Sequence, residues 1–353
     1  MSNIRLENIT KRFREVTALN DVTFTIKDGE FFVLLGPTGA GKTTTLRVIA
    51  GLEKQDSGHV YFDAELSDQI PPAERDVAFV FQQYSLYPNM SVYENLAFPL
   101  RSPLRQTPEA EIKTRIHHAA EKLRISHLLE RKTGKLSGGE MQRVSIGRAI
   151  VREPRVFLMD EPLSNLDAKL RESLRVELKH IQKTQNSTTV FVTHDQIEAL
   201  TMADRIAVLD EGHILQIGTP FDIYDRPATT AVAQLVGTPK INLLPTVRQN
   251  GSLVVQNSTV QINTPAGGVP EEVLLGVRPE DVKLTENGRF NGTVALIEPL
   301  GVETILHIQA GGQTLLSIVP GATTHRLNEA VRFDVSETHL HFFDAQGVRV
   351  QSG

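Results

Sequence analysis

A glycine-rich segment, residues 36–44, constrains this chain more than any other feature. It reads Gly36, Pro37, Thr38, Gly39, Ala40, Gly41, Lys42, Thr43 and Thr44. The segment directly follows the apolar run Phe31–Leu35 and opens a helix-like stretch. In that context glycines let backbone N–H groups converge on phosphate oxygens, and the helix N-terminus adds positive charge. We expect Lys42 to reach the outer phosphates and the Thr43 hydroxyl to bind Mg²⁺. The alternative is a purely structural turn.

A second apolar run ends in two adjacent carboxylates. Val156–Met159 is followed by Asp160 and Glu161. Asp160 would emerge beside the phosphate loop, where Mg²⁺ is held, and Glu161 would be placed to accept a proton from an attacking water. A buried strand that ends in an acidic turn is common by itself. Together with the phosphate loop it indicates hydrolysis of ATP or GTP.

Two further segments could contact phosphate. The turn 136–140 contains Ser137, Gly138 and Gly139 and leads into a helix, so its hydroxyl and free N–H groups form a possible anion site. A capped helix start explains the same residues without a ligand. His194 ends another apolar run, where an imidazole could touch a γ-phosphate or orient water; alone, such a histidine is usually structural.

The first two-thirds of the chain alternates strand-like and helix-like segments, which predicts an α/β fold with a mostly parallel sheet. The expected strands are Phe31–Leu35, Val77–Phe81, Val156–Met159, Thr188–Val192 and Ile206–Leu209. The expected helices are Lys42–Ala50, Glu109–Leu123, Gly139–Val151, Ala168–Thr184 and Asp195–Met202. Residues 93–152 interrupt the alternation with helical sequence alone, so we expect a helical subdomain at about 88–152.

After about Pro239 the pattern changes to short β-type segments between Gly, Asn and Pro turns, which predicts a small all-β domain. These segments are Ser252–Gln256, Leu274–Val277, Gly292–Leu296, Thr304–Ile308 and Thr314–Val319. With a linker around 237–239, the expected domains are 1–237 and 238–353.

Composition excludes several classes of protein. The chain has 353 residues and no Cys, so disulfides, thiolate metal sites and a cysteine nucleophile are ruled out. No apolar run is long enough to span a membrane, and the first residues lack a signal-peptide pattern, so we expect a cytoplasmic protein. The net charge of −5 argues against nucleic acid as a partner. Residues 101–152 carry 12 Lys+Arg against 5 Asp+Glu, which fits either a solvated face or a docking surface.

The order of these motifs resembles that of the ATP-binding subunits of ABC transporters, over essentially the whole chain. In sequence letters the motifs are GPTGAGKTT, VFQQYSLYP, LSGGEMQR, VFLMDEP, SNLD and VTHD. The resemblance implies that ATP and Mg²⁺ are the cofactors. Phe13 would stack on adenine, and Gln82 would sense the metal and the attacking water. Glu161 would be the general base and His194 the switch histidine. The implied metal contacts are Thr43, Gln82 and Asp160.

The resemblance also implies a head-to-tail dimer of this chain or of a close paralogue, enclosing two ATP molecules. Residues of one chain would contact the nucleotide of its partner. They are Arg131, Ser137, Gly138, Gly139, Glu140, Gln142 and Asp167. The family most often has Gln where this chain has Glu140. A carboxylate near a helix N-terminus is favoured, but one aimed at phosphate would repel it, so its direction is left open here.

Within the family, the β-rich tail resembles the oligonucleotide/oligosaccharide-binding-fold (OB-fold) tail of the maltose and glycerol-phosphate importer ATPases. The segments that carry this likeness are Gly276–Asp281, Leu300–Thr304 and His339–Asp344. In that group the tail is regulatory and helps to hold the dimer, although it could serve dimer contacts alone. The chain would then power uptake of a carbohydrate-type solute.

Such a chain would work at the cytoplasmic face of the plasma membrane with two permease subunits and a solute-binding protein. The stretch 84–98 would form the groove for a permease coupling helix. Two alternatives stay open: an importer of a polyamine, an inorganic anion or ferric iron, and a soluble DNA-repair or translation ATPase.

Overall fold

The computed structural model describes residues 2–103, 105, 107–249, 252–256, 258, 260–263 and 270–350. By its internal contacts the chain divides into two compact units, Met1–Pro220 and Phe221–Gly353. The predicted limits 1–237 and 238–353 stay a prediction.

A six-stranded sheet in the order β10-β9-β3-β8-β7-β6 forms the centre of the first unit. Its strands are β3 (Phe31–Leu35), β6 (Val77–Val80), β7 (Val156–Asp160), β8 (Thr188–Thr193), β9 (Arg205–Asp210) and β10 (His213–Gly218). All neighbours pair in parallel except β10, which pairs antiparallel with β9. β3, β7 and β8 are buried throughout, as expected for parallel strands covered on both faces. The predicted strand Val77–Phe81 ends one residue early.

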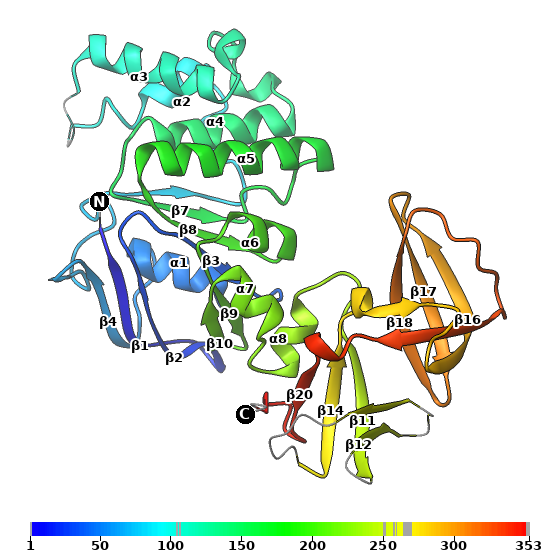
Figure 1. The fold of residues 1–353 in the computed structure, drawn as a ribbon. Coiled ribbons are helices and arrows are strands. Elements are labelled where there is room, and N and C mark those ends of the chain that lie inside the picture. The colour runs from blue at the N-terminus through cyan, green and yellow to red at the C-terminus, as the bar shows by residue number, and fades with distance from the viewer. Residues whose placement is uncertain are drawn as a thin grey trace. The chain divides into compact units, whose positions relative to one another are not determined.

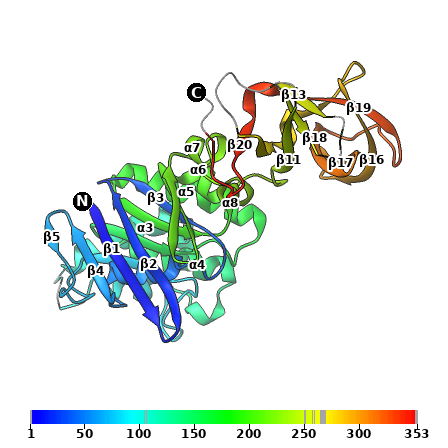
Figure 2. The ribbon, with the colours of Figure 1, turned by 90° about the horizontal axis from the view of Figure 1, so that it is seen from below.

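A second sheet, in the order β2-β1-β4-β5, covers one face of the first unit (Figures 1 and 2). Its strands are β1 (Ile4–Phe13), β2 (Val16–Ile26), β4 (Ser57–Phe62) and β5 (Glu65–Leu66). Helix α1 (Lys42–Ala50) packs against β2, β7 and β8, so one apolar core joins the two sheets around it. This antiparallel layer was not among the elements expected from the sequence.

Helices cover the other face of the central sheet, and the first three of them lie within the helical subdomain predicted at about 88–152. They are α2 (Val92–Ala97), α3 (Glu109–Lys122), α4 (Gly138–Ile150), α5 (Ala168–Gln185) and α6 (Gln196–Met202). Successive side chains of β3 point to opposite faces of the sheet. Phe32 and Leu34 belong to the core around α1, whereas Phe31 lies with Ile150 of α4 and Leu178 of α5. In the described residues between α2 and α4 there is no strand, as predicted.

The second unit contains two short helices and two antiparallel sheets. The helices are α7 (Pro220–Asp225) and α8 (Thr230–Leu235). One sheet has the order β13-β12-β11-β14-β20, with β11 (Asn242–Gln249), β12 (Ser252–Val255), β13 (Gln261–Asn263), β14 (Glu272–Val277) and β20 (His341–Phe343). The other has the order β15-β19-β16-β17-β18, with β15 (Val282–Leu284), β16 (Phe290–Pro299), β17 (Glu303–Ala310), β18 (Gln313–Pro320) and β19 (Ala330–Val335). One apolar core joins both sheets, which confirms the predicted all-β tail.

Candidate active site

The phosphate loop joins β3 to α1 and has the backbone that its glycines permit. Gly39 and Gly41 have φ of 86° and 104°, in the left-handed region that other residues rarely adopt. A Cβ at Gly36 would lie 2.0 Å from the carbonyl oxygen of Leu209, so no other residue fits there. The backbone of the loop is therefore set by sterics, and it leads into the N-terminus of α1, where an anion is favoured.

Lys42 is buried at the first position of α1. Its Nζ donates to the carbonyl oxygens of Gly36 and Pro37 at 2.8 and 2.7 Å, and an ammonium has one more proton to donate. Burial lowers the pKa of Lys42, while the nearby carboxylates of Glu161 and Asp160 oppose that shift. This cation sits between the loop and the acidic pair.

Thr43 meets Asp160 at the carboxyl end of β7. The Thr43 hydroxyl donates to Asp160 Oδ1 at 2.8 Å. Burial raises the pKa of Asp160; the Thr43 hydrogen bond opposes this shift, and the neighbouring charge of Glu161 adds to it. Two side-chain oxygens from distant parts of the sequence thus meet next to the phosphate loop.

Glu161 gathers two other predicted residues around its carboxylate. Its Oε2 lies 3.2 Å from His194 Nδ1 and accepts a hydrogen bond from Gln82 Nε2 at 3.3 Å. The Glu161 backbone has a φ of 42°, a strained value for a residue with a Cβ. The Glu161 side chain is 16% exposed and the His194 side chain is 55% exposed. Glu161 Oε2 is therefore held by its two neighbours, while the carboxylate remains accessible to solvent.

Phe13 lies at the end of β1, where it pairs with Val16 across the turn into β2. It is 43% exposed, with the Lys11 ammonium 5.0 Å from its ring centroid. An exposed aromatic ring with a cation on one side leaves a face for a planar base. Further along β2, the Ala18 carbonyl packs against Gly41 of the phosphate loop, so this sheet borders the site.

The turn before α4 is folded on itself by Glu140. Ser137 is the N-cap, and its Oγ accepts from the Glu140 N–H at 3.4 Å. Glu140 Oε2 accepts from the Ser137 N–H at 2.8 Å and from its hydroxyl at 2.9 Å. These bonds lower the pKa of Glu140, the backbone N–H most of all. The carboxylate therefore caps α4, which is the reciprocal arrangement of a capping box.

The other residues predicted to contact a partner's nucleotide lie around this turn. Arg131 is exposed, with its guanidinium 4.0 Å from the Glu140 carboxylate, and Asp167 caps α5 through the Leu170 N–H. Gln142 is 1% exposed on α4, so its side chain does not reach the surface of the turn. Among the described residues, no hydrogen bond or ion pair joins Ser137–Glu140 to the phosphate loop.

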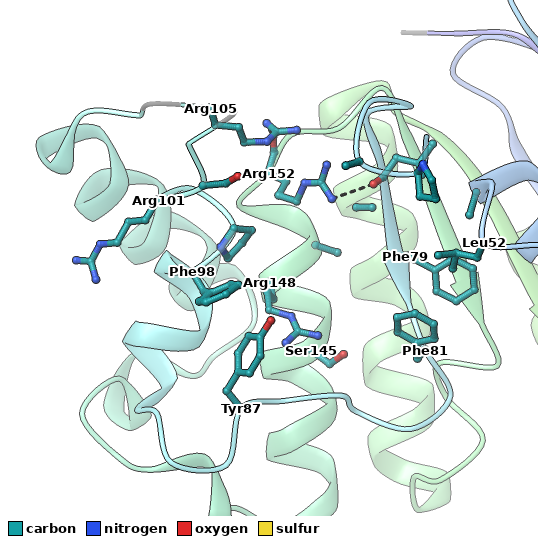
Figure 3. A pocket seen from close by; sticks show the side chains of 18 of the residues that line it. Leu52, Phe79, Phe81, Tyr87, Phe98, Arg101, Arg105, Ser145, Arg148 and Arg152 are labelled. Atoms are coloured by element: carbon teal, nitrogen blue, oxygen red, sulfur yellow. Dashed lines mark hydrogen bonds between the residues drawn. The ribbon is translucent and has the colours of Figure 1, made fainter. Parts of the chain in front are cut away.

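A groove of about 750 Å³ opens on the helical side of the first unit (Figure 3). Apolar side chains and arginines line it. They include Leu52, Phe79, Phe81, Tyr87, Phe98, Arg101, Arg105, Arg148 and Arg152. Arg148 Nη1 donates to the Ser85 carbonyl at 2.8 Å, and its guanidinium lies 5.5 Å from the Tyr87 ring centroid. The groove therefore touches the same loop that carries Gln82.

Comparison with known proteins decides the family. A family model described as "ABC transporter" matches residues 19–164, and one described as "TOBE domain" matches residues 275–343. The chain is 47% identical to the sn-glycerol-3-phosphate import ATP-binding protein UgpC of Brucella abortus, over 99% of each protein. It is 44% identical to the trehalose/maltose import ATP-binding protein MalK of Thermococcus litoralis, over 98% of each. The chain belongs to the ABC transporter ATP-binding proteins.

Solved structures agree with this assignment for the first unit. A dimeric ATP-binding cassette in a post-hydrolysis state, bound to ADP and phosphate, has a TM-score of 0.56 and 32% identity. The match covers 62% of this chain and 98% of that one. The expected fold, an ABC ATPase domain followed by a β-rich domain, is thereby confirmed, and the β-rich part is a TOBE domain. No helix in the described ranges is long and apolar enough to cross a membrane.

Three residues of this ABC ATPase that sequence reasoning did not single out also contact the site. Asn165 Nδ2 donates to the Gln82 carbonyl at 3.2 Å. Glu198 is buried and accepts from the Thr193 hydroxyl at 2.6 Å, one residue before His194. Arg171 reaches the loops that precede α5 and α6. Asn165 lies within the SNLD motif and Arg171 lies one turn into the helix that follows it, so both positions gave a signal, whereas Glu198 gave none.

Proposed function

We propose that this chain hydrolyses ATP to power uptake of a carbohydrate-type solute, such as a sugar, a polyol or a glycerol-phosphate-like compound. The observation that carries the proposal is full-length similarity to two importer proteins. Both UgpC and MalK match through the TOBE domain as well as the ATPase domain. A cassette alone would be compatible with many cargoes, since fold does not fix function.

In this proposal Glu161 accepts the proton of the attacking water. A general base must lie within hydrogen-bond reach of that proton with a free lone pair. Glu161 Oε2 is occupied by His194 and Gln82, which leaves Oε1 for the water. His194 and Gln82 then orient the carboxylate, while Lys42 and the loop N–H groups balance the charge on phosphate.

The site residues fit Mg²⁺, which the family implies. Mg²⁺ in nucleotide sites takes one or two protein oxygens and completes its shell with phosphate and water. The Thr43 hydroxyl and the Asp160 carboxylate supply such oxygens 2.8 Å apart. The side chain of Gln82 is hydrogen-bonded to Glu161, the residue that follows Asp160. The described residues hold no cluster of three or more acidic or histidine side chains that could hold a metal ion. When bound, Mg²⁺ would neutralise charge on the transferred phosphate.

The proposed active unit is a head-to-tail dimer. Among the described residues, Ser137–Gly139 make no hydrogen bond to the phosphate loop of their own chain. The N–H groups of Gly138 and Gly139 would serve the nucleotide of a partner, because the N–H of Ser137 is taken by Glu140. Dimeric structure in the matched cassette supports this. The cap fixes the direction of the Glu140 carboxylate, which accepts from the Ser137 N–H and hydroxyl.

In the proposed dimer, the groove of each copy receives one helix from one of the two permease subunits. This contact lies at the cytoplasmic face of the membrane. Its apolar lining suits the apolar face of a short helix, and its arginines suit acidic residues beside it. A solute-binding protein would deliver the cargo to those permeases.

The test is to purify the assembled transporter in vesicles and to measure ATPase rates with binding protein and single solutes. We expect stimulation by a sugar, a polyol or a glycerol phosphate. Stimulation only by a polyamine, an inorganic anion or ferric iron would overturn the proposed cargo. Glu161→Gln is the matched control, because it should retain ATP binding and lose turnover; turnover at the wild-type rate would rule out Glu161 as the base.

A further inference from the structure

One arginine of α5 bonds two loops that are far apart in the sequence. Arg171 Nη2 donates to the Leu166 carbonyl at 3.1 Å and lies 3.5 Å from the Ser164 carbonyl. Its Nη1 pairs with Asp195 Oδ2 at 3.5 Å. The first loop is the SNLD segment that ends in Asp167, and the second follows His194.

Asp195 divides its two oxygens between separate tasks. Oδ1 caps α6 by accepting from the N–H groups of Ile197 and Glu198 at 2.7 and 3.2 Å, and Oδ2 faces Arg171. The Asp195 N–H donates to the Thr193 hydroxyl, which is itself bound to buried Glu198. His194 therefore sits between two residues whose side chains are fixed, and Arg171 links this network to the SNLD loop.

We propose that Arg171 is a positioning residue for hydrolysis: it ties the SNLD loop to Asp195 and so sets where His194 stands against Glu161. The SNLD loop is also bound to the Gln82 carbonyl through Asn165 at 3.2 Å, so both groups that hold Glu161 Oε2 are connected to it. Arg171 would let movement of the SNLD loop, which lies at the proposed dimer contact, reach His194. The inference rests on the proposed roles of Glu161 and His194.

The geometry argues for more than a stabilising contact. A guanidinium presents five donors in a rigid fork, and here its two terminal nitrogens serve acceptors on different loops. The side chain is 34% exposed, so the ion pair alone is expected to add little stability. Its Nε is buried without a hydrogen-bond partner in the described structure. An unsatisfied buried donor lowers the stability of the folded state, so this conformation of Arg171 is not the one that stability alone would favour.

The test compares Arg171→Met and Arg171→Lys with the unchanged chain, measuring kcat, KM for ATP and the thermal midpoint. We expect Met to lower kcat about tenfold to a hundredfold, as misplacement of a catalytic group does. KM and the midpoint should change little. Lys should restore part of the rate, because one ammonium cannot serve both loops. Arg175→Met, one turn further along α5, is the matched control and should keep the wild-type rate.

A double-mutant cycle with Asp195→Asn separates positioning from folding. Asparagine keeps the Oδ1 cap of α6 but loses the ion pair with Arg171. We expect the double variant to be no slower than the worse single one, since both act through one link. Multiplied effects on kcat, or a raised KM with unchanged kcat, would overturn the proposal. Should Met prevent folding, the cycle is run with Arg171→Lys, and the parallel Glu161→Gln variant tests the base assignment on its own.

Discussion

Glu140 is the residue at which this chain departs from the commonest form of its family, and the structure explains how the departure is tolerated. Its partly exposed carboxylate accepts hydrogen bonds from the N–H and the hydroxyl of Ser137. Helix caps accept Glu or Gln in this place, because both side chains carry the required oxygen. The exchange therefore changes charge near the nucleotide but preserves the start of α4.

This gives a prediction for two substitutions. Glu140→Gln should keep the stability of the ATPase domain within a few tenths of a kcal/mol, because the cap survives. Glu140→Ala should cost about 1 kcal/mol, because two donors of Ser137 lose their acceptor. Thermal unfolding measures both. Equal loss in the two variants would mean that charge, not the cap, is what matters at this position.

At the scale of the elements, β20 of the TOBE-containing unit carries a buried histidine. His341 is 4% exposed, pairs through its backbone with Gly276 of β14, and has no partner for its Nδ1 in the described structure. Burial lowers the pKa of His341 to about 4, and the charges of Arg278, Arg349 and His339 act in the same direction. The ring is therefore held neutral at physiological pH.

The free energy of unfolding of this unit should decrease as the pH is lowered through a defined window. The unfolded chain binds a proton at His341 near pH 6.5, whereas the folded chain does so only near pH 4. The stabilisation is complete above about pH 6.5 and is lost progressively towards pH 4, by about 3 kcal/mol in all. Thermal midpoints recorded across this range should fall less steeply in His341→Leu. The exposed neighbour variant His339→Leu serves as control, and a wild-type slope in His341→Leu would contradict the assignment.

Sequence reasoning predicted those elements whose pattern is local. The strands β3, β7 and β8 are continuous apolar runs, and the phosphate loop and the acidic pair have fixed spacing, so each was located nearly to the residue. The antiparallel layer β1-β2-β4-β5 was missed, because register shifts in its long strands interrupt the regular alternation of buried and exposed residues that indicates a strand. The bonds of Arg171 and Asn165 were beyond reach as well, since they depend on loops that only the tertiary fold brings together.

At the scale of the whole ATPase domain, the groove and the catalytic residues share one loop. The loop 81–87 contributes Phe81 and Tyr87 to the lining of the groove. The same loop contains Gln82, whose side chain donates a hydrogen bond to Glu161. Arg148 fastens the middle of the loop to α4, the helix that begins at Ser137. A helix bound in the groove can therefore influence both Glu161 and the turn at Ser137 through the loop 81–87.

We predict that a charge in the groove uncouples the transporter. Phe98 is half exposed and lies with its ring centroid 4.5 Å from that of Tyr87. Phe98→Asp should abolish solute-stimulated ATPase activity and copurification of the permease, because apolar contact is lost, while basal hydrolysis persists. Val176→Asp, at an exposed apolar position of α5 outside the groove, is the control. Full stimulation in Phe98→Asp would place the permease contact elsewhere.

The distance between the capped turn and the phosphate loop of the same chain has a genetic consequence. In the proposed dimer each site takes its loop from one copy and its Ser137 turn from the other. A copy damaged only at Lys42 and a copy damaged only at Ser137 are each inactive when paired with themselves. When the two are paired with each other, both lesions fall in one site and the other site is intact. Coexpression of the two damaged copies would therefore yield mixed dimers with one complete site, which neither copy forms by itself.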